Sequence, residues 1–459
     1  MVEKPQPGEV KSSGTAREPR EVRQTDLAIL GSLGDQALMT MEEVLRRENL
    51  LKALQRVKSN GGAPGVDGMT VEELGPHLVE HWESLREKLR AGTYVPSPVR
   101  LVEIPKANGK GTRRLGIPTV LDRLIQQALL QVLQTPFDRT FSESSFGFRP
   151  GRNTLQAVQR ARGYAREGYR WVVNLDLDSF FDRVNHDILM SLLARSIEDG
   201  RILRLIRRYL QAGLLEDGVI SPRFQGTPQG GPLSPLLSNV LLDVLDRELE
   251  SRGHRFVRYA DDCTIYVRTR RSGERVLSSL RCFLAKHLRL VVNESKSAVD
   301  QVWRQDLLGY SMTSHEEPKL RISRDSLLRF RAKLRVYFRR GRGRSVSQVL
   351  EELRPILRGW IQYYRAVEAL TDLDDLDRWL RRRLRLLLWR HWKYPKTRHE
   401  NLLRLGVSPR LARIGAWNGH GPWVNSGRRH MNIAVPNRWL AKQGLLDLRQ
   451  EHHRLACRT

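Results

Sequence analysis

Hydrophobic positions along the chain follow two periods, and the pattern changes near residue 320. Before that point, segments with helical spacing alternate with short apolar runs typical of strands, which predicts a mixed α+β body. Beyond it the pattern turns helical, and a tail rich in Trp, Gly and Asn follows at 417–439. The predicted strands cover 97–104, 170–177, 255–259 and 263–267, and the predicted helices cover 41–58, 70–90, 121–133, 154–167, 186–195 and 233–248.

The two ends of the chain have different patterns. Residues 1–35 are rich in Pro, Ser, Gly and mixed charge without periodicity, which predicts a disordered leader. In the C-terminal part, apolar residues recur at helical spacing inside arginine-rich runs, as at Leu327, Phe330 and Leu334. Each such helix is expected to have one buried side and one cationic side.

The composition favours some classes of protein and argues against others. The 459 residues carry 79 Lys and Arg against 51 Asp and Glu, a formal charge of +28, so a polyanion is the expected partner. Three cysteines without a C-x-x-C pair argue against a disulfide framework and a structural zinc finger, and favour a cytoplasmic protein. No run approaches about 18 apolar residues and the polar start lacks a signal core, so neither a membrane span nor secretion is expected.

The positive charge is concentrated in the C-terminal part. Residues 321–459 hold 32 Lys and Arg against 11 Asp and Glu. A solvated helix face would explain such runs as an ordinary structural feature. Because these helices also have an apolar side, we favour a surface that contacts a phosphate backbone.

Two apolar segments carry carboxylates. Asp176 and Asp178 lie in WVVNLDLDSFFD, and Asp261 and Asp262 lie side by side between two short strands, as at the tip of a hairpin. Adjacent carboxylates repel, and with no His or Cys nearby they favour a hard cation, Mg²⁺ or Mn²⁺. Two such ions can activate a hydroxyl and stabilise a leaving phosphate. The alternative is an ordinary Asp-rich turn.

Two further segments fit phosphate chemistry. QGTPQGGP, at 225–232, makes a turn where the backbone can approach a ligand closely, although a plain loop before a helix explains it equally well. IPKANGKGTRRLGIPT, at 104–119, is a basic hairpin bounded by prolines and suited to a triphosphate. Such hairpins are also common on cationic proteins.

In this order, the motifs resemble those of the group II intron reverse transcriptase/maturase family. YADD resembles the family's metal-binding box, NLDLDSFFD its first carboxylate motif and QGTPQGGPLSPLLSN its nucleotide-side loop. FGFRPGRN, LVVNESKS, LLGY and GWIQYYR resemble further fingers, palm and thumb elements, and the resemblance spans about residues 45–445. It implies an α+β right-hand polymerase, with fingers and an antiparallel palm sheet, followed by an α-helical thumb/maturase domain.

The resemblance also implies domain boundaries. After the leader, it assigns 36–165 to an N-terminal extension and fingers, and 166–315 to a palm interleaved with the fingers. It assigns 316–400 to the helical thumb/maturase domain and 401–459 to a basic nucleic-acid-binding tail.

The resemblance implies three catalytic carboxylates. Asp176, Asp261 and Asp262 would hold two Mg²⁺ ions, with Mn²⁺ as a substitute, and the backbone carbonyl of Leu177 would help. Asp178 would share the strand face of Asp176 if the strand continues, so it is a weaker candidate ligand.

The same resemblance implies the nucleotide contacts. Lys106 and Arg113 would contact the incoming triphosphate, Gln229 would lie against the nucleotide, and Phe181 would exclude a ribose 2′-OH. Lys296 matches the family lysine near the palm edge. The primer grip would comprise Leu308, Gly309 and Tyr310.

Basic and aromatic residues of the C-terminal part are candidates for RNA contact. The arginines are Arg335, Arg339, Arg340, Arg381, Arg382 and Arg383. The interleaved aromatic residues, Trp360, Tyr363, Tyr364, Trp379, Trp389, Trp392 and Tyr394, could stack on bases, although each of them taken singly is more often helix core.

The sequence departs from the family pattern at two points. Arg114 stands where the family often has Pro, and we expect this to be tolerated. No H-N-H-like nuclease motif with paired cysteines follows the maturase tail, and His452, His453 and Cys457 do not make a zinc site.

The predicted function is therefore that of a bacterial RNA-directed DNA polymerase encoded by a group II intron, which also assists splicing and retrohoming. Its expected partners are group II intron RNA, an RNA template with a DNA primer, target DNA and dNTPs. Two alternatives stay open: a maturase without polymerase activity, and a domesticated reverse transcriptase in DNA repair or phage defence.

Overall fold

The computed structural model describes residues 39–105, 111–216, 219–221, 223–340 and 343–457. The leader predicted at residues 1–35 lies outside the described residues. Residues 39–459 form one contact unit, so the internal domain boundaries expected from the resemblance stay predictions.

The N-terminal helices are α2 (Met41–Val44), α3 (Arg47–Asn60) and α4 (Leu74–Arg90). The single helix predicted over 41–58 is wrong, because the chain leaves the helical path after Val44. The side-chain amide of Asn49 donates a hydrogen bond to the carbonyl of Val44 at 2.9 Å, which satisfies the end of α2.

The predicted basic hairpin is confirmed. β1 (Val99–Pro105) pairs antiparallel with β2 (Thr112–Ile117). On its other side β1 pairs parallel with β4 (Leu214–Glu216), which pairs with β5 (Val219–Ser221). The tip of the hairpin, residues 106–110, lies outside the described residues, and with it the predicted triphosphate contact Lys106.

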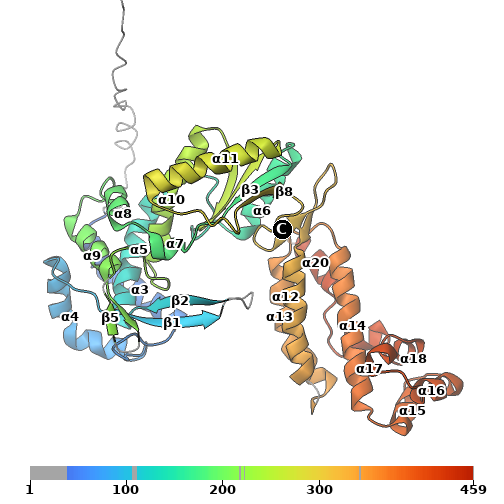
Figure 1. The fold of residues 1–459 in the computed structure, drawn as a ribbon. Helices are drawn as coiled ribbons and strands as arrows, with labels where there is room; N and C mark the ends of the chain where they lie inside the picture. Colours follow the sequence, from blue (N-terminus) through green and yellow to red (C-terminus); the bar gives the residue numbers. More distant parts are fainter. Residues whose placement is uncertain (1–38, 106–110, 217–218, 222, 341–342, 458–459) are drawn as a thin grey trace, which may run out of the picture. The chain divides into compact units, whose positions relative to one another are not determined.

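A second sheet, which we call the central sheet, is antiparallel and has the order β6-β7-β3-β8. Its strands are β6 (Arg255–Tyr259), β7 (Asp262–Val267), β3 (Trp171–Leu175) and β8 (Ala298–Gln301). Successive residues of β3 face opposite sides, so Val173 joins one hydrophobic cluster and Val172 joins another. The first cluster includes α11 (Arg270–Phe283), which lies along one face of the sheet (Figure 1), and the second includes α6 (Thr154–Arg166).

Helices connect the two sheets. They are α5 (Val120–Thr140), α7 (Phe180–Arg183), α8 (His186–Leu193), α9 (Gly200–Gln211) and α10 (Ser234–Ser251), and the π-helix η1 (Leu284–Leu288) follows α11. α5 extends beyond the predicted end at 133, through Pro136, because Phe137 is also buried in the core. α6 begins at a capping box in which Asn153 and Gln156 bind each other's backbone N–H groups.

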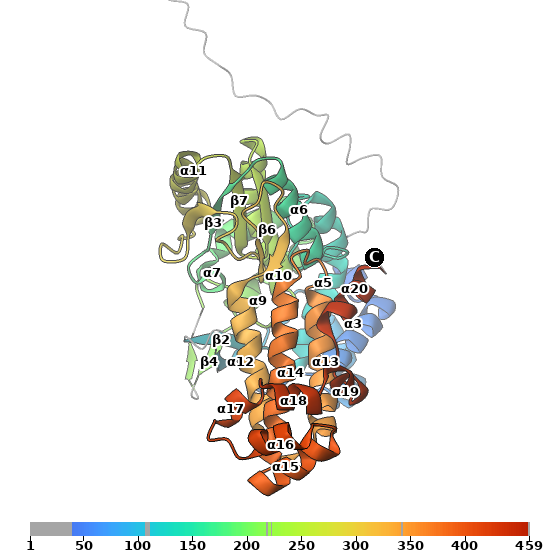
Figure 2. The same cartoon turned by 90° about the vertical axis from the view of Figure 1, so that its right-hand side faces the viewer.

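The C-terminal part is helical, as the sequence predicts. A short sheet of β9 (Tyr310–Met312) and β10 (Leu320–Ile322) comes first. Three long helices, α12 (Arg324–Arg340), α13 (Val346–Tyr363) and α14 (Thr371–His391), then lie side by side (Figure 2). The remaining helices are α15 (Pro395–Arg404), α16 (Pro409–Ala416), α17 (Pro422–Asn425), α18 (Arg429–Ala434), α19 (Asn437–Lys442) and α20 (Leu448–Ala456).

Candidate active site

Three of the predicted carboxylates lie at one end of the central sheet. Asp261 lies in the turn of the β6–β7 hairpin, and Asp262 begins β7. Asp176 follows the last residue of β3, and that residue, Leu175, pairs with Cys263 of β7. Because β3 and β7 are neighbours, the turn and the end of β3 bring these carboxylates to the same edge; we call them the carboxylate site.

The electrostatics of the carboxylate site reflect this crowding. Although the Asp262 side chain reaches solvent, the protein packed around it and the neighbouring carboxylates Asp261 and Asp176 raise its pKa to about 6. Partial burial and the charge of Asp176 also raise the pKa of Asp261. Both shifts indicate concentrated negative charge, which a cation would relieve.

Lys296 supplies a cation at this position. Its Nζ lies 3.1 Å from Oδ2 of Asp176. Among the residues that the structure describes, no three His, Cys, Asp or Glu side chains converge closely enough to hold a metal ion. The donor set nevertheless fits a hard divalent cation, since it consists of carboxylate oxygens with unbalanced charge.

The end of β3 is fixed by the segment that contains Lys296. Ser297 Oγ accepts a hydrogen bond from the Asp176 N–H at 3.0 Å, and the Asn293 N–H donates to the Asp176 carbonyl at 2.9 Å. Leu177 is buried and forms an isolated bridge with Val292. The LVVNESKS motif therefore positions the backbone on which Asp176 depends.

The structure separates Asp178 from the other carboxylates. β3 ends at Leu175 and does not continue to residue 177, so the condition under which Asp178 would share the strand face of Asp176 is not met. The Asp178 carboxylate forms an ion pair with Arg183 at 2.7 Å. Asp178 is thus a surface partner of Arg183 rather than part of the carboxylate site.

A buried arginine holds the turn that carries Asp261. Arg258 and Asp246 are fully buried and form an ion pair at 2.6 Å. Arg258 Nη1 also donates to the Asn239 side chain and to the carbonyl of Ala260, both at 2.9 Å. Ala260 has a positive φ of 59°, so this carbonyl contact fixes a strained turn.

The FGFRPGRN segment packs directly against the same turn. A Cβ atom on Gly147 would lie 2.2 Å from the backbone nitrogen of Ala260, so only glycine fits. The Asn239 side-chain amide donates to the Gly147 carbonyl at 2.9 Å. The sequence analysis missed Arg258 and Asn239; the signal for Arg258 was a charged residue inside the apolar run FVRYA.

Four predicted residues line one cavity beside the carboxylate site. The cavity has a volume of about 650 Å³, and Arg113, Phe181, Gln229 and Asp261 all contribute to its wall. We call it the site cavity. Further polar and aromatic lining residues, which the sequence analysis missed, are Arg56, Asn60, Arg123, Gln127, Gln134 and Phe148.

Loops from distant segments shape this cavity. The Thr227 N–H donates to the Phe181 carbonyl at 2.7 Å, so the QGTPQGGP loop holds the short helix of Phe181. The Gly116 N–H donates to the Gln229 carbonyl at 2.8 Å, which ties the same loop to β2. The loop therefore joins the basic hairpin to the helix that follows β3.

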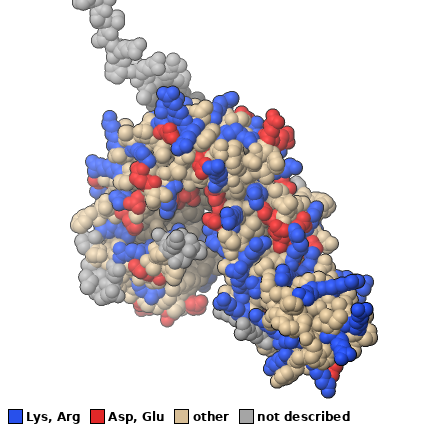
Figure 3. All heavy atoms as spheres, turned by 45° about the vertical axis from the view of Figure 1, so that its right-hand side comes forward, with Lys and Arg blue, Asp and Glu red and all other residues tan. Residues whose placement is uncertain are grey.

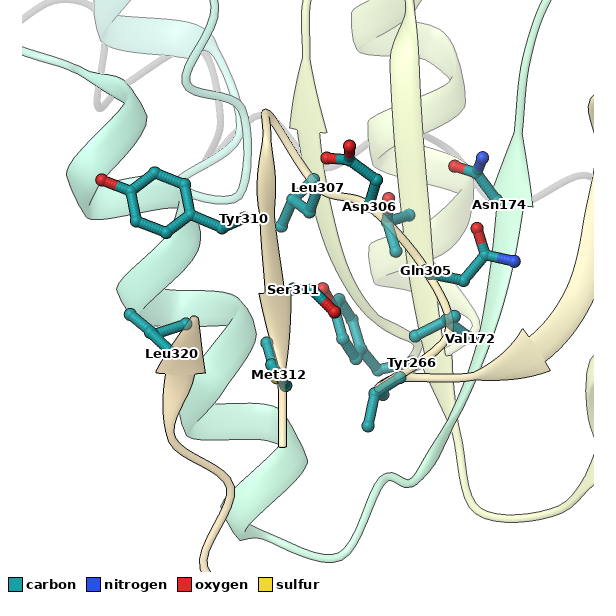
Figure 4. A pocket seen from close by; sticks show the side chains of 12 residues that line it. Val172, Asn174, Tyr266, Gln305, Asp306, Leu307, Tyr310, Ser311, Met312 and Leu320 are labelled. Atoms are coloured by element: carbon teal, nitrogen blue, oxygen red, sulfur yellow. The ribbon is translucent and has the colours of Figure 1, made fainter. Parts of the chain in front are cut away.

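The predicted primer-grip segment forms a tight loop at the start of β9. Leu308 and Gly309 both have positive φ, at 54° and 81°. Asp306 accepts hydrogen bonds from the Gly309 N–H and the Ser323 hydroxyl, both at 2.6 Å. Figure 4 shows Tyr310 of this segment beside residues of the central sheet. A cavity of about 20 Å³ lies between them.

Four arginines surround a groove between α12 and α14. They are Arg335, Arg339, Arg383 and Arg390, and apolar side chains from the same helices complete a cavity of about 400 Å³. We call it the α12–α14 groove. Within the described residues, no carboxylate lies within ion-pair distance of these four guanidinium groups. Burial and the other three arginines lower the pKa of Arg383.

The other predicted RNA-contact arginines have different surroundings. Arg381 forms an ion pair with Asp447 at 2.6 Å. The Arg382 guanidinium lies over the Trp423 ring, 4.0 Å from its centroid. The side chain of Arg340 lies outside the described residues. Figure 3 shows Lys and Arg side chains gathered over the C-terminal helices.

The aromatic candidates also divide. Trp389 and Trp392 are buried, and Trp360 stacks on Phe330 with ring centroids 4.2 Å apart, so these three serve the helical core. Tyr394 is 70% exposed and Tyr363 is 45% exposed. Only exposed rings of this kind are free to stack on bases.

Comparisons with known proteins place the chain in a family. Residues 104–312 match the family "Reverse transcriptase (RNA-dependent DNA polymerase)", and residues 327–406 match "Group II intron, maturase-specific domain". Protein YkfC of Escherichia coli is 33% identical over 301 residues, which are 56% of this chain and 78% of that protein. Group II intron-encoded protein LtrA of Lactococcus lactis subsp. cremoris is 36% identical over 232 residues, which are 48% of this chain and 38% of LtrA.

Among solved structures, the chain is similar to a protein of the partial Cas6-RT-Cas1–Cas2 complex. The identity is 24%, the TM-score is 0.35, and the similarity covers 54% of this chain and 42% of that one.

The fold and the site define a reverse transcriptase, an RNA-directed DNA polymerase, with a helical maturase domain after it. The chain belongs to the family of group II intron-type reverse transcriptases. The predicted α+β fold and the family resemblance are confirmed. The family descriptions imply RNA and other nucleic acids as partners, and reverse transcriptase domains generally use divalent metal ions. In the part of the chain that the structure describes, no helix is long and apolar enough to cross a membrane.

Proposed function

We propose that this chain adds dNTPs to the 3′-OH of a primer on an RNA template. The observation that carries the proposal is the position of Asp261. It belongs to the carboxylate site and also lines the site cavity, together with Arg113, Phe181 and Gln229. A nucleotide in this cavity would lie beside the carboxylate site, whose negative charge a cation would balance.

The residues of the site cavity would contact different parts of the nucleotide. Arg113 would face the triphosphate, and Arg56 and Arg123, which line the same cavity, would add positive charge. Gln229 would lie against the nucleotide. Phe181 would contact the sugar and exclude a 2′-OH by its bulk. Lys106 remains an expectation from the family, since it lies outside the described residues.

Asp176, Asp261 and Asp262 would hold two Mg²⁺ ions, or Mn²⁺ in their place, with the Leu177 carbonyl as a further oxygen donor. When bound, such ions lower the pKa of an attacking hydroxyl and stabilise the charge on a leaving phosphate. Lys296 would orient the Asp176 carboxylate through its ion pair of 3.1 Å.

In the proposed reaction, the primer 3′-oxygen attacks the α-phosphorus of the dNTP and loses its proton to solvent. A new P–O bond forms, and the bond between the α-phosphorus and the bridging oxygen breaks. Pyrophosphate leaves with the electron pair. The protein itself supplies orientation and charge stabilisation, which are the main protein contributions in phosphoryl transfer.

We further propose that the C-terminal helices bind group II intron RNA, and that the protein assists splicing and copies the intron at target DNA. Support comes from the maturase-specific match over 327–406 and from the α12–α14 groove within it. Four guanidinium groups around one groove suit the phosphates of a nucleic acid.

Primer extension on an RNA template tests the polymerase proposal. The wild type should extend a DNA primer with dNTPs and Mg²⁺, and the Asp261→Ala/Asp262→Ala variant should not. Asp178→Ala is the matched control, since it removes a nearby carboxylate that pairs with Arg183, and it should keep activity. Extension by the double variant would refute the metal-ligand assignment. No extension by the wild type, with RNA binding intact, would favour a maturase without polymerase activity.

A further inference from the structure

The loop that would grip the primer is held by the end of helix α13. We propose that Tyr363 is a positioning residue for the primer 3′ end, because its hydroxyl fixes the backbone of the Leu308–Tyr310 loop. This inference rests on the proposed polymerase function. The inference goes beyond that function because it assigns a role to Tyr363, a residue of the helical domain. Tyr363 lies 55 positions from its partner Leu308 in the sequence.

The central contact is a hydrogen bond from a side chain to a backbone carbonyl. The Tyr363 hydroxyl donates to the carbonyl of Leu308 at 2.7 Å. Leu308 has φ 54°, a conformation that residues other than Gly, Asn and Asp adopt rarely. A carbonyl contact at such a residue selects one orientation of the loop and compensates for its strain.

A second hydrogen bond runs from the loop to the end of α13. The Tyr310 hydroxyl donates to the Tyr363 carbonyl, and the two rings are 5.9 Å apart. A Cβ atom on Gly309 would lie 2.6 Å from the hydroxyl oxygen of Tyr364, so the loop backbone fits closely against this tyrosine. The loop therefore cannot shift without moving the end of α13.

The exposure of Tyr363 argues against a purely structural role. Tyr364 and Tyr310 are 5% and 2% exposed and belong to the helical core, whereas Tyr363 is 45% exposed. Thr154, the first residue of α6, lies close enough to the Tyr363 hydroxyl to interact with it. The Tyr363 side chain thus joins the loop to α6 as well as to α13.

The kinetic consequence follows from the geometry of primer attack. A misplaced reacting oxygen reduces the rate of bond formation far more than it reduces binding, and a displacement of about 1 Å costs about a hundredfold. Loss of the Leu308 contact should let the loop relax, so that the primer still binds but its 3′-OH is misplaced. The expected signature is a lower kcat with little change in the KM for primer–template.

The experiment compares conservative variants in single-nucleotide primer extension. Tyr363→Phe keeps the ring and removes the hydroxyl. We expect kcat to fall about tenfold and the KM for primer–template to change by less than about twofold. Tyr337→Phe on α12 is the matched control, because its hydroxyl makes no hydrogen bond within the described residues, and it should leave both constants unchanged.

Two more variants separate the contacts. Thr154→Val removes the hydroxyl close to that of Tyr363 and should keep the wild-type kcat. Tyr310→Phe removes the reciprocal hydrogen bond, and its effect should not add to that of Tyr363→Phe, since both weaken one interlocked unit. The melting temperature of each variant is measured alongside, and that of Tyr363→Phe should lie no more than about 4 °C below that of the control, as loss of one hydrogen bond predicts.

The outcomes are distinct. If the wild type extends primers and Tyr363→Phe does so at the same kcat, the inference is wrong. It is also wrong if Tyr363→Phe raises the KM alone, or if Thr154→Val reproduces its effect. A wild type that extends no primer at all would instead overturn the polymerase proposal.

Discussion

At the scale of single residues, a buried charge determines the shape of the active-site turn. Arg258 is fully buried, pairs with Asp246, and donates to the carbonyl of Ala260 in the turn that carries Asp261. Arg258→Ala should lower the free energy of unfolding by about 3–5 kcal/mol, because it leaves the Asp246 charge buried without a partner. Denaturant unfolding measures this loss.

A double variant separates stability from positioning. Arg258→Met/Asp246→Leu removes both charges and should recover most of the lost stability, since apolar residues of similar volume can replace a buried ion pair. It should not recover polymerase activity, because the Ala260 carbonyl still lacks its donor. Full recovery of both properties would show that the turn needs no such contact.

Phe181 gives a second prediction at this scale. Phe181 lines the site cavity, and Phe181→Ala should open space beside the sugar. The preference for dNTPs over rNTPs should then fall by about tenfold or more, as measured by the ratio of kcat/KM values. Unchanged selectivity, with activity retained, would rule out the proposed gate. Phe180→Ala is unsuitable as a control, because Phe180 is part of the core.

Only part of this site can be recognised from the residue types in the sequence. The position of the carboxylates at one end of the sheet could be predicted, because Asp176 and Asp261 follow apolar strand segments, where an unpaired charge is costly. Arg56, Arg123 and Phe148 could not, because they reach the site cavity from separate helices and loops. Their role depends on packing between distant segments, which a pattern along the chain does not contain.

At the scale of elements, the turn between β6 and β7 depends on close backbone packing. Gly147→Ala should displace this turn, because the added Cβ would lie 2.2 Å from the Ala260 nitrogen. We expect primer extension to fall about a hundredfold or more, since the carboxylates move with the turn. The control is Gly163→Ala in α6, where the added Cβ would meet nothing within 4 Å. That variant should keep activity and gain up to about 1 kcal/mol of stability.

Helices and strands could be predicted from the sequence where their apolar residues kept a single spacing, either helical or strand-like. The β6–β7 hairpin and α6 lie close to their predicted positions, because their apolar spacing and their turn or cap residues agree. The single helix predicted over 41–58 was wrong because the helix breaks after Val44, where the Asn49 side chain binds the Val44 carbonyl, a local detail that the helical pattern does not reveal. β3 stops short of its predicted end because the 291–297 segment binds the backbone after Leu175.

At the scale of the whole molecule, the charge of +28 is unevenly distributed. Charge counts alone, which need no structure, predict a polyanion partner and favour the C-terminal part as its binding surface, and the binding surface stays a prediction. The sequence could not tell which arginines are available. Arg381 is occupied by Asp447, whereas Arg390, absent from the predicted contacts, joins the α12–α14 groove.

The groove arginines, which pair with no carboxylate in the described residues, should therefore contribute more to RNA binding than paired arginines do. Replacing the four arginines of the α12–α14 groove with Ala should weaken RNA binding and flatten its salt dependence. Each lost phosphate contact should reduce the slope of log K against log salt by about 0.7–0.9, so the loss of four contacts should reduce it by up to about 2.8–3.6. The measurement is RNA affinity between low and moderate salt. The control replaces four arginines that already pair with carboxylates, Arg46, Arg207, Arg270 and Arg281. It removes the same formal charge from the molecule, so equal slopes for the two variants would mean that total charge, and not the groove, binds the RNA.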